Sequence, residues 1–180
     1  NKRSVVLDIK SDAGRAAAPR LAERADVLIE NFRPGTLDRA GLGYDDLRAR
    51  NERLIYCSIT GFGSDGPYRD RPGYDTIGQA MSGLLSLLTQ KDAPQPMGIS
   101  LSDHLGGIFA CYGVLAALLA RTRTGRGQRV ETSLLQSSIA FLAENAANFF
   151  EGKAPAPDRA TRTRQAQVFG QPRGLELAIA

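Results

Sequence analysis

Short apolar runs and amphipathic stretches alternate along the first 60 residues. The apolar runs predict three strands, at residues 3–10, 26–32 and 53–60. The second run has an uninterrupted apolar core, which is typical of a parallel strand buried on both faces. Residues 13–25, which follow the N-cap types Ser11 and Asp12, predict a helix. The alternation of strand and helix predicts an α/β fold with a parallel sheet.

The pattern changes after residue 60. Residues 61–73, "GFGSDGPYRDRPG", predict a loop rich in glycine and proline. Further helices are expected at the following ranges: 74–90, about 103–123, and 134–152. "RVETS", at 129–133, predicts a short strand. We expect residues 1–152 to form part of one domain and residues 153–180 to form a linker and the start of the next segment, in a chain that looks truncated at both ends.

Composition narrows the class of protein. The chain has 42% hydrophobic and 23% charged residues, as in ordinary globular domains. Its longest apolar stretch, 105–120, is interrupted by glycines, so we predict no membrane span. Cys57 and Cys111 lie in apolar surroundings, which favours buried free thiols in a reducing compartment such as the cytoplasm. One histidine and no cluster with metal-ligand spacing argue against a metal site.

The net charge of +4 is unevenly distributed. Arginines gather at 121–129 and 158–165. They fit either solvated loops and helix ends or a polyanionic partner, which could be a nucleic acid or a phosphate-bearing cofactor.

Two local motifs suggest chemistry that their context does not support. "GFGSDG", at 61–66, matches the glycine pattern of dinucleotide-binding loops, but Pro67 and more loop follow where that site needs a helix. Ser102, Asp103 and His104 are the residue types of a hydrolase triad, yet neighbours on a helix point about 100° apart. We expect the glycine loop to lie near a site and His104 to face solvent.

Asp103 is the acid that most needs an explanation. It stands between the extended apolar residues 96–102 and a long apolar helix. One interpretation is a helix N-cap. The other is a nucleophile, because a helix N-terminus keeps a carboxylate ionised and Gly106 and Gly107 let a ligand approach the backbone.

Four motifs resemble the class III CoA-transferase family, which includes formyl-CoA and carnitine-type CoA-transferases. They are "ENFRPG" (30–35), "SITGFG" (58–63), "RPGYD" (71–75) and "TGRGQ" (124–128). The resemblance covers the chain to about Gly152 and implies a Rossmann-like parallel sheet in a subunit of an interlocked, ring-like homodimer. It implies that CoA moves between carboxylic acids through an aspartyl anhydride and an aspartyl-CoA thioester. It places that aspartate at Asp103.

The resemblance also implies a binding site for CoA and acyl-CoA, as substrates rather than as a tightly bound cofactor. The residues expected beside the nucleotide or the pantetheine arm are Leu7, Asp8, Ile9, Lys10, Asn31, Phe32, Arg33, Arg39, Arg71, Pro72, Gly73 and Tyr74. The piece alone is expected to be inactive, because later family elements such as a second glycine-rich loop are absent from it.

Two alternatives remain open. An acyl-CoA racemase of the same family would carry a histidine at Tyr74 to move a proton, so Tyr74 favours transfer. A basic nucleic-acid-binding module would use Arg121 to Arg129, but no RNA- or DNA-binding motif accompanies them. After Gly152 the chain keeps only "QVF" (167–169) of the pattern that many relatives carry there.

Overall fold

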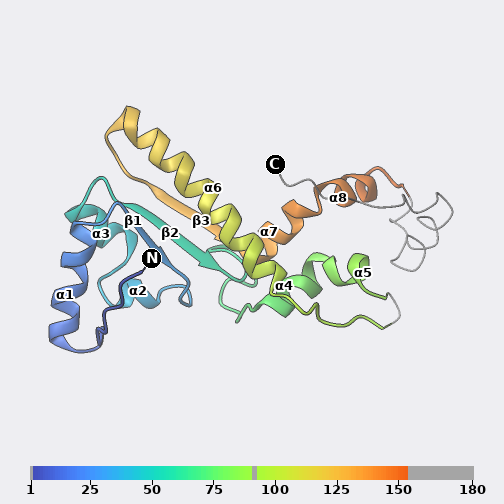
Figure 1. The fold of residues 1–180 in the computed structure, drawn as a ribbon, viewed down its shortest axis with the longest axis horizontal. Coiled ribbons are helices and arrows are strands. Elements are labelled where there is room, and N and C mark those ends of the chain that lie inside the picture. Colours follow the sequence, from blue (N-terminus) through green and yellow to red (C-terminus); the bar gives the residue numbers. More distant parts are fainter. Residues whose placement is uncertain (1, 91–92, 154–180) are drawn as a thin grey trace, which may run out of the picture.

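A three-stranded parallel sheet organises the chain. The computed structural model describes residues 2–90 and 93–153. The strands are β1 (Val27–Glu30), β2 (Ile55–Thr60) and β3 (Arg129–Ser133), in the order β1-β2-β3. Leu28 pairs with Tyr56, and Cys57 pairs with Val130. The mixed α/β architecture with a parallel sheet is therefore confirmed (Figure 1).

Three helices lie on the β1 side of the sheet. They are α1 (Asp12–Glu23), α2 (Thr36–Arg39) and α3 (Tyr44–Arg50). The Ser11 hydroxyl caps α1 by accepting the Gly14 N–H, as the sequence predicted. The apolar core of this side consists of Ala22, Leu37, Leu42, Leu47, Leu54 and Tyr56. This packing fixes the N-terminal helices against the sheet.

The chain crosses from β2 to β3 through α4 (Asp75–Ser82), α5 (Leu84–Leu88) and α6 (Leu101–Thr124). The long helix α6 lies along β2 and β3 and packs against α7 (Leu134–Phe141), which follows β3 directly. The last described helix is α8 (Ala143–Phe150). Because β2 and β3 are parallel, this crossover brings the N-terminus of α6 to the carboxyl edge of the sheet.

Several sequence predictions are wrong. Residues 2–8 form no strand, because no other strand pairs with them within the described chain, and Val6 is 96% exposed. The helix expected over 74–90 is split at Gly83, whose φ of 90° lies in the left-handed region that ends a helix. The helix expected over 134–152 is split at Leu142. Cys57 is buried as expected, but Cys111 is exposed because it lies on the side of α6 that faces away from the sheet.

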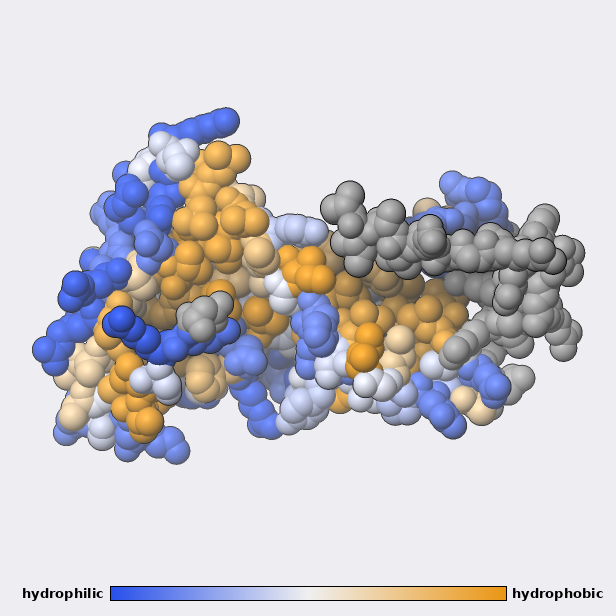
Figure 2. Space-filling view, in the orientation of Figure 1, coloured by the Kyte–Doolittle hydropathy of each residue, from blue (hydrophilic) through white to orange (hydrophobic). Residues whose placement is uncertain are grey.

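That outer side of α6 is apolar. Exposed apolar side chains recur along it at Ile108, Tyr112, Leu115 and Leu119. Figure 2 shows hydrophobic surface along this helix. Within the described residues α6 is also the one helix long and apolar enough to cross a membrane by length and composition, a test that core helices of soluble proteins pass as well. The hydropathy of α6 alone therefore does not place the chain in a membrane.

Candidate active site

A cavity of about 610 Å³ opens at the carboxyl edge of the sheet. The loop after β1, the end of β2 and the start of α7 after β3 all contribute to its wall. The N-terminal parts of α4 and α6 complete it. The lining residues are Asn31, Phe32, Arg33, Pro34, Ile59, Thr60, Gly61, Arg69, Arg71, Pro72, Gly73, Tyr74, Asp75, Thr76, Ser100, Asp103, Gly107 and Leu134. Ligand sites in parallel α/β sheets are found at this edge.

Glu30, the last residue of β1, holds the first wall of the cavity in place. One carboxylate oxygen accepts the Ser58 hydroxyl on β2, and the other accepts the Phe32 N–H at 2.9 Å. The side chain thus bridges two strands and the loop that follows β1. This contact explains why "ENFRPG" begins with an acid at the end of a strand.

Two glycines bring the ends of the loop over 61–73 together. A Cβ added to Gly61 would lie 2.4 Å from the Cα of Gly73, and a Cβ added to Gly73 would lie equally close to Gly61. Only glycine permits this backbone approach. The contact holds Tyr74 and the start of α4 beside the end of β2. Arg71 stacks over the Tyr68 ring at 4.3 Å within the same loop.

Asp103 lies in the first turn of α6 and lines the cavity. It is not the N-cap. Ser100 holds that position, and Asp103 is the third residue of the helix, so the cap interpretation is wrong. Its neighbours face elsewhere. Ser102 is fully buried and accepts the Ser138 hydroxyl, while His104 Nδ1 lies 2.6 Å from the Ser100 carbonyl. The three residues therefore form no triad.

A second carboxylate, Asp75, lines the same cavity from the start of α4. Its Oδ1 accepts the N–H groups of Ser102 (2.8 Å) and Asp103 (3.3 Å), and its Oδ2 accepts from the Gln79 side chain (2.6 Å). Asp75 is not among the site residues expected from the sequence, although the motif "RPGYD" contains it. An acid at a predicted helix start has a sufficient local explanation as a cap, and the contact with α6 spans 27 positions.

The electrostatics of Asp103 follow from this geometry. Partial burial raises the pKa of its carboxyl, and the charge of Asp75 raises that pKa further, while His104 lowers it. Arg33, Arg69 and Arg71 also line the cavity. An acid and several guanidinium groups thus share one opening, an arrangement that suits an anionic ligand beside a nucleophile.

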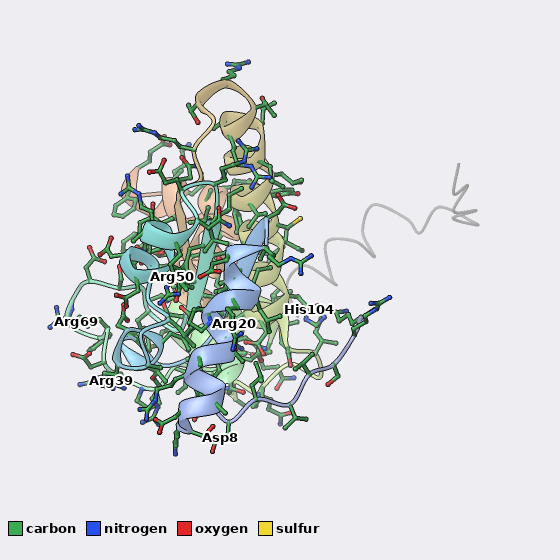
Figure 3. All side chains as sticks on the ribbon, turned by 90° about the vertical axis from the view of Figure 1, so that its left-hand side faces the viewer. Asp8, Arg20, Arg39, Arg50, Arg69 and His104 are labelled. Carbon is green, nitrogen blue, oxygen red and sulfur yellow. The ribbon has the colours of Figure 1, made fainter. Side chains whose placement is uncertain are left out.

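The expected CoA-site residues divide into two groups. The following line the cavity together with Asp103: Asn31, Phe32, Arg33, Arg71, Pro72, Gly73 and Tyr74. The residues Leu7, Asp8, Ile9, Lys10 and Arg39 are not part of this lining. In Figure 3, Arg39 and Arg69 project from the same side of the molecule, and Asp8 lies near the start of α1. The roles of all these residues in binding CoA remain predictions.

Two arginines of the stretch 121–129 have local partners. Arg121 pairs with Asp26 at 2.8 Å and donates to the Arg53 carbonyl at 2.9 Å, so it joins α6 to the loops before β1 and β2. Arg129 forms an ion pair with Glu131. These contacts assign both side chains structural roles. The second arginine-rich stretch, 158–165, lies outside the described residues.

Comparisons with curated proteins agree with the motifs. The chain is 45% identical over 158 residues to acetyl-CoA:oxalate CoA-transferase of Acetobacter aceti, which covers 86% of this chain and 41% of the relative. It is 44% identical over 156 residues to succinate–glutarate CoA-transferase of Agrobacterium fabrum, with 86% of this chain and 39% of the relative covered. The chain thus spans about two fifths of the length of these relatives.

Solved structures give the same result. The crystal structure of a CAIB/BAIF family protein from Brucella suis matches with a TM-score of 0.82 at 42% identity, over 87% of this chain and 42% of that one. The family model described as CoA-transferase family III matches residues 1–175. The family model and the structural match each cover most of the chain, and the chain belongs to CoA-transferase family III.

Proposed function

We propose that the protein containing this chain moves CoA between carboxylic acids, with Asp103 as the nucleophile. One observation carries the assignment. The cavity holds two carboxylates, and Asp75 has both oxygens engaged by Ser102, Asp103 and Gln79. The carboxylate of Asp103, by contrast, accepts no hydrogen bond from any residue that the structure describes. It is the carboxylate free to attack.

The chemistry balances without an oxidant, a reductant or a net proton. An Asp103 oxygen attacks the thioester carbonyl of the donor acyl-CoA, so a mixed anhydride forms and the C–S bond breaks to release CoA thiolate. The thiolate attacks the aspartyl carbonyl, which gives an aspartyl-CoA thioester and frees the donor acid. The acceptor carboxylate then displaces the thiolate and forms a second anhydride. The thiolate then attacks the acceptor's carbonyl carbon in this second anhydride, which yields the new acyl-CoA and restores the Asp103 carboxylate.

The surroundings of Asp103 favour this role. The dipole of α6, whose first turn carries Asp103, opposes the effect of burial on the pKa and so favours the ionised form that attacks. Partial desolvation and the nearby Asp75 raise the pKa of the carboxyl, which makes the anion a better nucleophile than a fully hydrated one. Gly107, one turn further along α6, adds no side chain to the wall of the cavity. A thioester can therefore come close to Asp103.

The relatives support the substrate class. Their names specify oxalate, succinate and glutarate as acids that receive or give up CoA. We extend to this protein the use of carboxylic acids and their CoA thioesters. From the resemblance we also propose a homodimer of interlocked subunits, and from the two free cysteines a cytoplasmic location. Sedimentation of the full-length protein as a monomer would contradict the dimer.

The test uses the full-length protein. CoA transfer is measured from acetyl-CoA and succinyl-CoA to oxalate and glutarate, for wild type, Asp103→Asn and the control Asp45→Asn. Asp45 is an exposed acid in the first turn of α3, outside the cavity. We expect Asp103→Asn to lose several orders of magnitude in kcat because the covalent route is closed, and Asp45→Asn to match wild type. An Asp103→Asn variant with most of its activity would exclude Asp103 as the nucleophile.

A further inference from the structure

The N-terminus of α6 is capped by a side chain from another helix. Ser100, its N-cap residue, makes no capping hydrogen bond with its own side chain. The next two N–H groups that need acceptors, those of Ser102 and Asp103, both donate to Oδ1 of Asp75. A helix N-terminus needs such acceptors for its unpaired N–H groups. Here the acceptor comes from α4, 27 residues earlier in the chain.

Asp75 is itself held by a buried glutamine. Gln79, fully buried one turn along α4, donates to Asp75 Oδ2 at 2.6 Å and to the Ile99 carbonyl at 3.1 Å. Its amide oxygen accepts the Met97 N–H at 3.2 Å. The pair therefore ties the segment before α6, and then α6 itself, to the start of α4. Each polar group of the pair has a partner, and such satisfied networks are rigid.

From this geometry we infer that Asp75 is a positioning residue for the nucleophile: it fixes the backbone of Asp103 at the cavity wall and sets a negative charge beside its carboxylate. The inference rests on the proposed role of Asp103. Asp75 does not attack the substrate in this account, because its two oxygens are occupied. It acts through Asp103, by holding the turn that carries it.

The charge of Asp75 has a measurable consequence for titration. The charged and titratable groups that line the cavity with Asp103 are Asp75 and Tyr74 at the start of α4 and Arg33, Arg69 and Arg71 from the loops, while α7 contributes the uncharged Leu134. His104 is the neighbour on α6 itself. Burial and then Asp75 raise the pKa of Asp103. Removing the charge of Asp75 should lower that pKa, and the acidic limb of the kcat–pH profile should move to lower pH.

Two substitutions in the full-length protein separate charge from capping. Asp75→Ala removes both, and kcat should fall by roughly tenfold to a hundredfold because the turn with Asp103 is misplaced. The KM for acyl-CoA should change much less. Asp75→Asn keeps an oxygen that accepts the two N–H groups, so part of kcat should return. Both variants should shift the acidic limb downward, while Asp45→Asn should leave kcat and the limb at wild-type values.

A readout that does not need activity accompanies the kinetics. Hydrogen exchange of a peptide covering residues 99–106 should be faster in Asp75→Ala than in wild type, because the Ser102 and Asp103 N–H groups lose their acceptor. If Asp75→Ala does not fold, the pH at which the acidic limb of the kcat–pH profile lies in Asp75→Asn decides whether Asp75 acts on Asp103.

The outcomes are distinguishable. If wild type transfers no CoA, or if Asp103→Asn stays active, the proposed function fails and the positioning role fails with it. If wild type is active, Asp103→Asn is inactive and Asp75→Asn has wild-type kcat and an unmoved limb, only the positioning role is overturned and Asp75 is a helix cap.

Discussion

The β1 side of the sheet and the junction of α4, α6 and α7 are both buried, but they are buried by different kinds of side chain. On the β1 side Leu47, Leu54 and Tyr56 are 1–4% exposed. At the junction several polar side chains are buried among apolar ones such as Leu105, Ala117 and Leu134; the polar ones are Gln79, Ser102, Ser133, Ser137 and Ser138. Apolar burial is strong but has no preferred direction, whereas hydrogen bonds between buried groups require particular geometries.

The difference separates stability from positioning. The apolar cluster on the β1 side contributes to the free energy of folding through burial and, among the described residues, has no polar network of its own. The polar junction lies directly behind the cavity, where Ser138 donates to Ser102 at 2.9 Å and Asp75 receives the N–H groups of α6. We infer that the first region mainly stabilises the chain and that the second mainly sets the geometry around Asp103.

A core truncation should have the largest effect on stability. Leu47→Ala in the full-length protein should lower the free energy of unfolding by about 2–5 kcal/mol, because it removes buried methyl groups and leaves a cavity. Leu21→Ala is the matched control, since Leu21 is 55% exposed on α1, and it should cost much less. Denaturant titration measures both. Equal losses for the two variants would contradict the assignment of the core to this side.

The serine pair should show a smaller effect that is not additive. Ser102→Ala leaves the buried Ser138 hydroxyl without its partner and should cost about 1–3 kcal/mol. The double variant with Ser138→Ala should cost less than the sum of the two single variants, because no unpaired hydroxyl remains. The same denaturant titration gives the four free energies. Strict additivity would show that the hydrogen bond is not part of the packing at this junction.

Substitution of Arg39 tests whether the β1 side of the sheet also contributes to ligand binding. Arg39 lies on α2, two residues after the core residue Leu37, and outside the cavity lining. We propose from the family resemblance that it binds a phosphate of CoA, where a charge-assisted hydrogen bond is worth about 1.5–3 kcal/mol. Arg39→Ala should therefore weaken CoA binding by roughly tenfold or more in calorimetry. An unchanged affinity would remove Arg39 from the site.

The smallest effect concerns stability against pH. The pKa of Asp103 is raised in the folded protein, chiefly by burial. Its folded state therefore holds a proton more tightly than its unfolded state, so its contribution to stability is full below the unfolded pKa and is lost as pH rises through the folded pKa. Asp103→Asn should consequently be at least as stable as wild type at neutral pH. Thermal unfolding at acidic and neutral pH measures this, and a variant less stable at neutral pH would indicate a structural role.

Local patterns in the sequence predict much of this fold. Val27–Glu30 and Ile55–Thr60 are apolar runs between turn residues, and α6 is a long apolar helix that ends before Gly125. Each of these patterns lies within the residues of the strand or helix that it predicts. The run at 3–10 has the same local appearance, but a strand needs a partner, and the described chain provides none beside it.

The candidate site could be predicted only in part. Asp103 stands out because an acid interrupts an apolar stretch, and the loop residues around Arg33 and Arg71 belong to motifs. Asp75 could not be found in this way. Its partners on α6 lie 27 and 28 positions away, and its effect on that helix depends on how two helices meet at the carboxyl edge of the sheet.

Trapping the covalent intermediate is the most direct test of the role of Asp103. Full-length wild type is incubated with acyl-CoA and then with hydroxylamine, which converts an aspartyl anhydride or thioester to the hydroxamate, or with borohydride, which reduces the thioester. Tandem mass spectrometry then locates the modified residue. Modification is expected at Asp103 and nowhere else, dependent on acyl-CoA and absent from Asp103→Asn. Modification at Asp75 or at another residue, or none in an active enzyme, would contradict it.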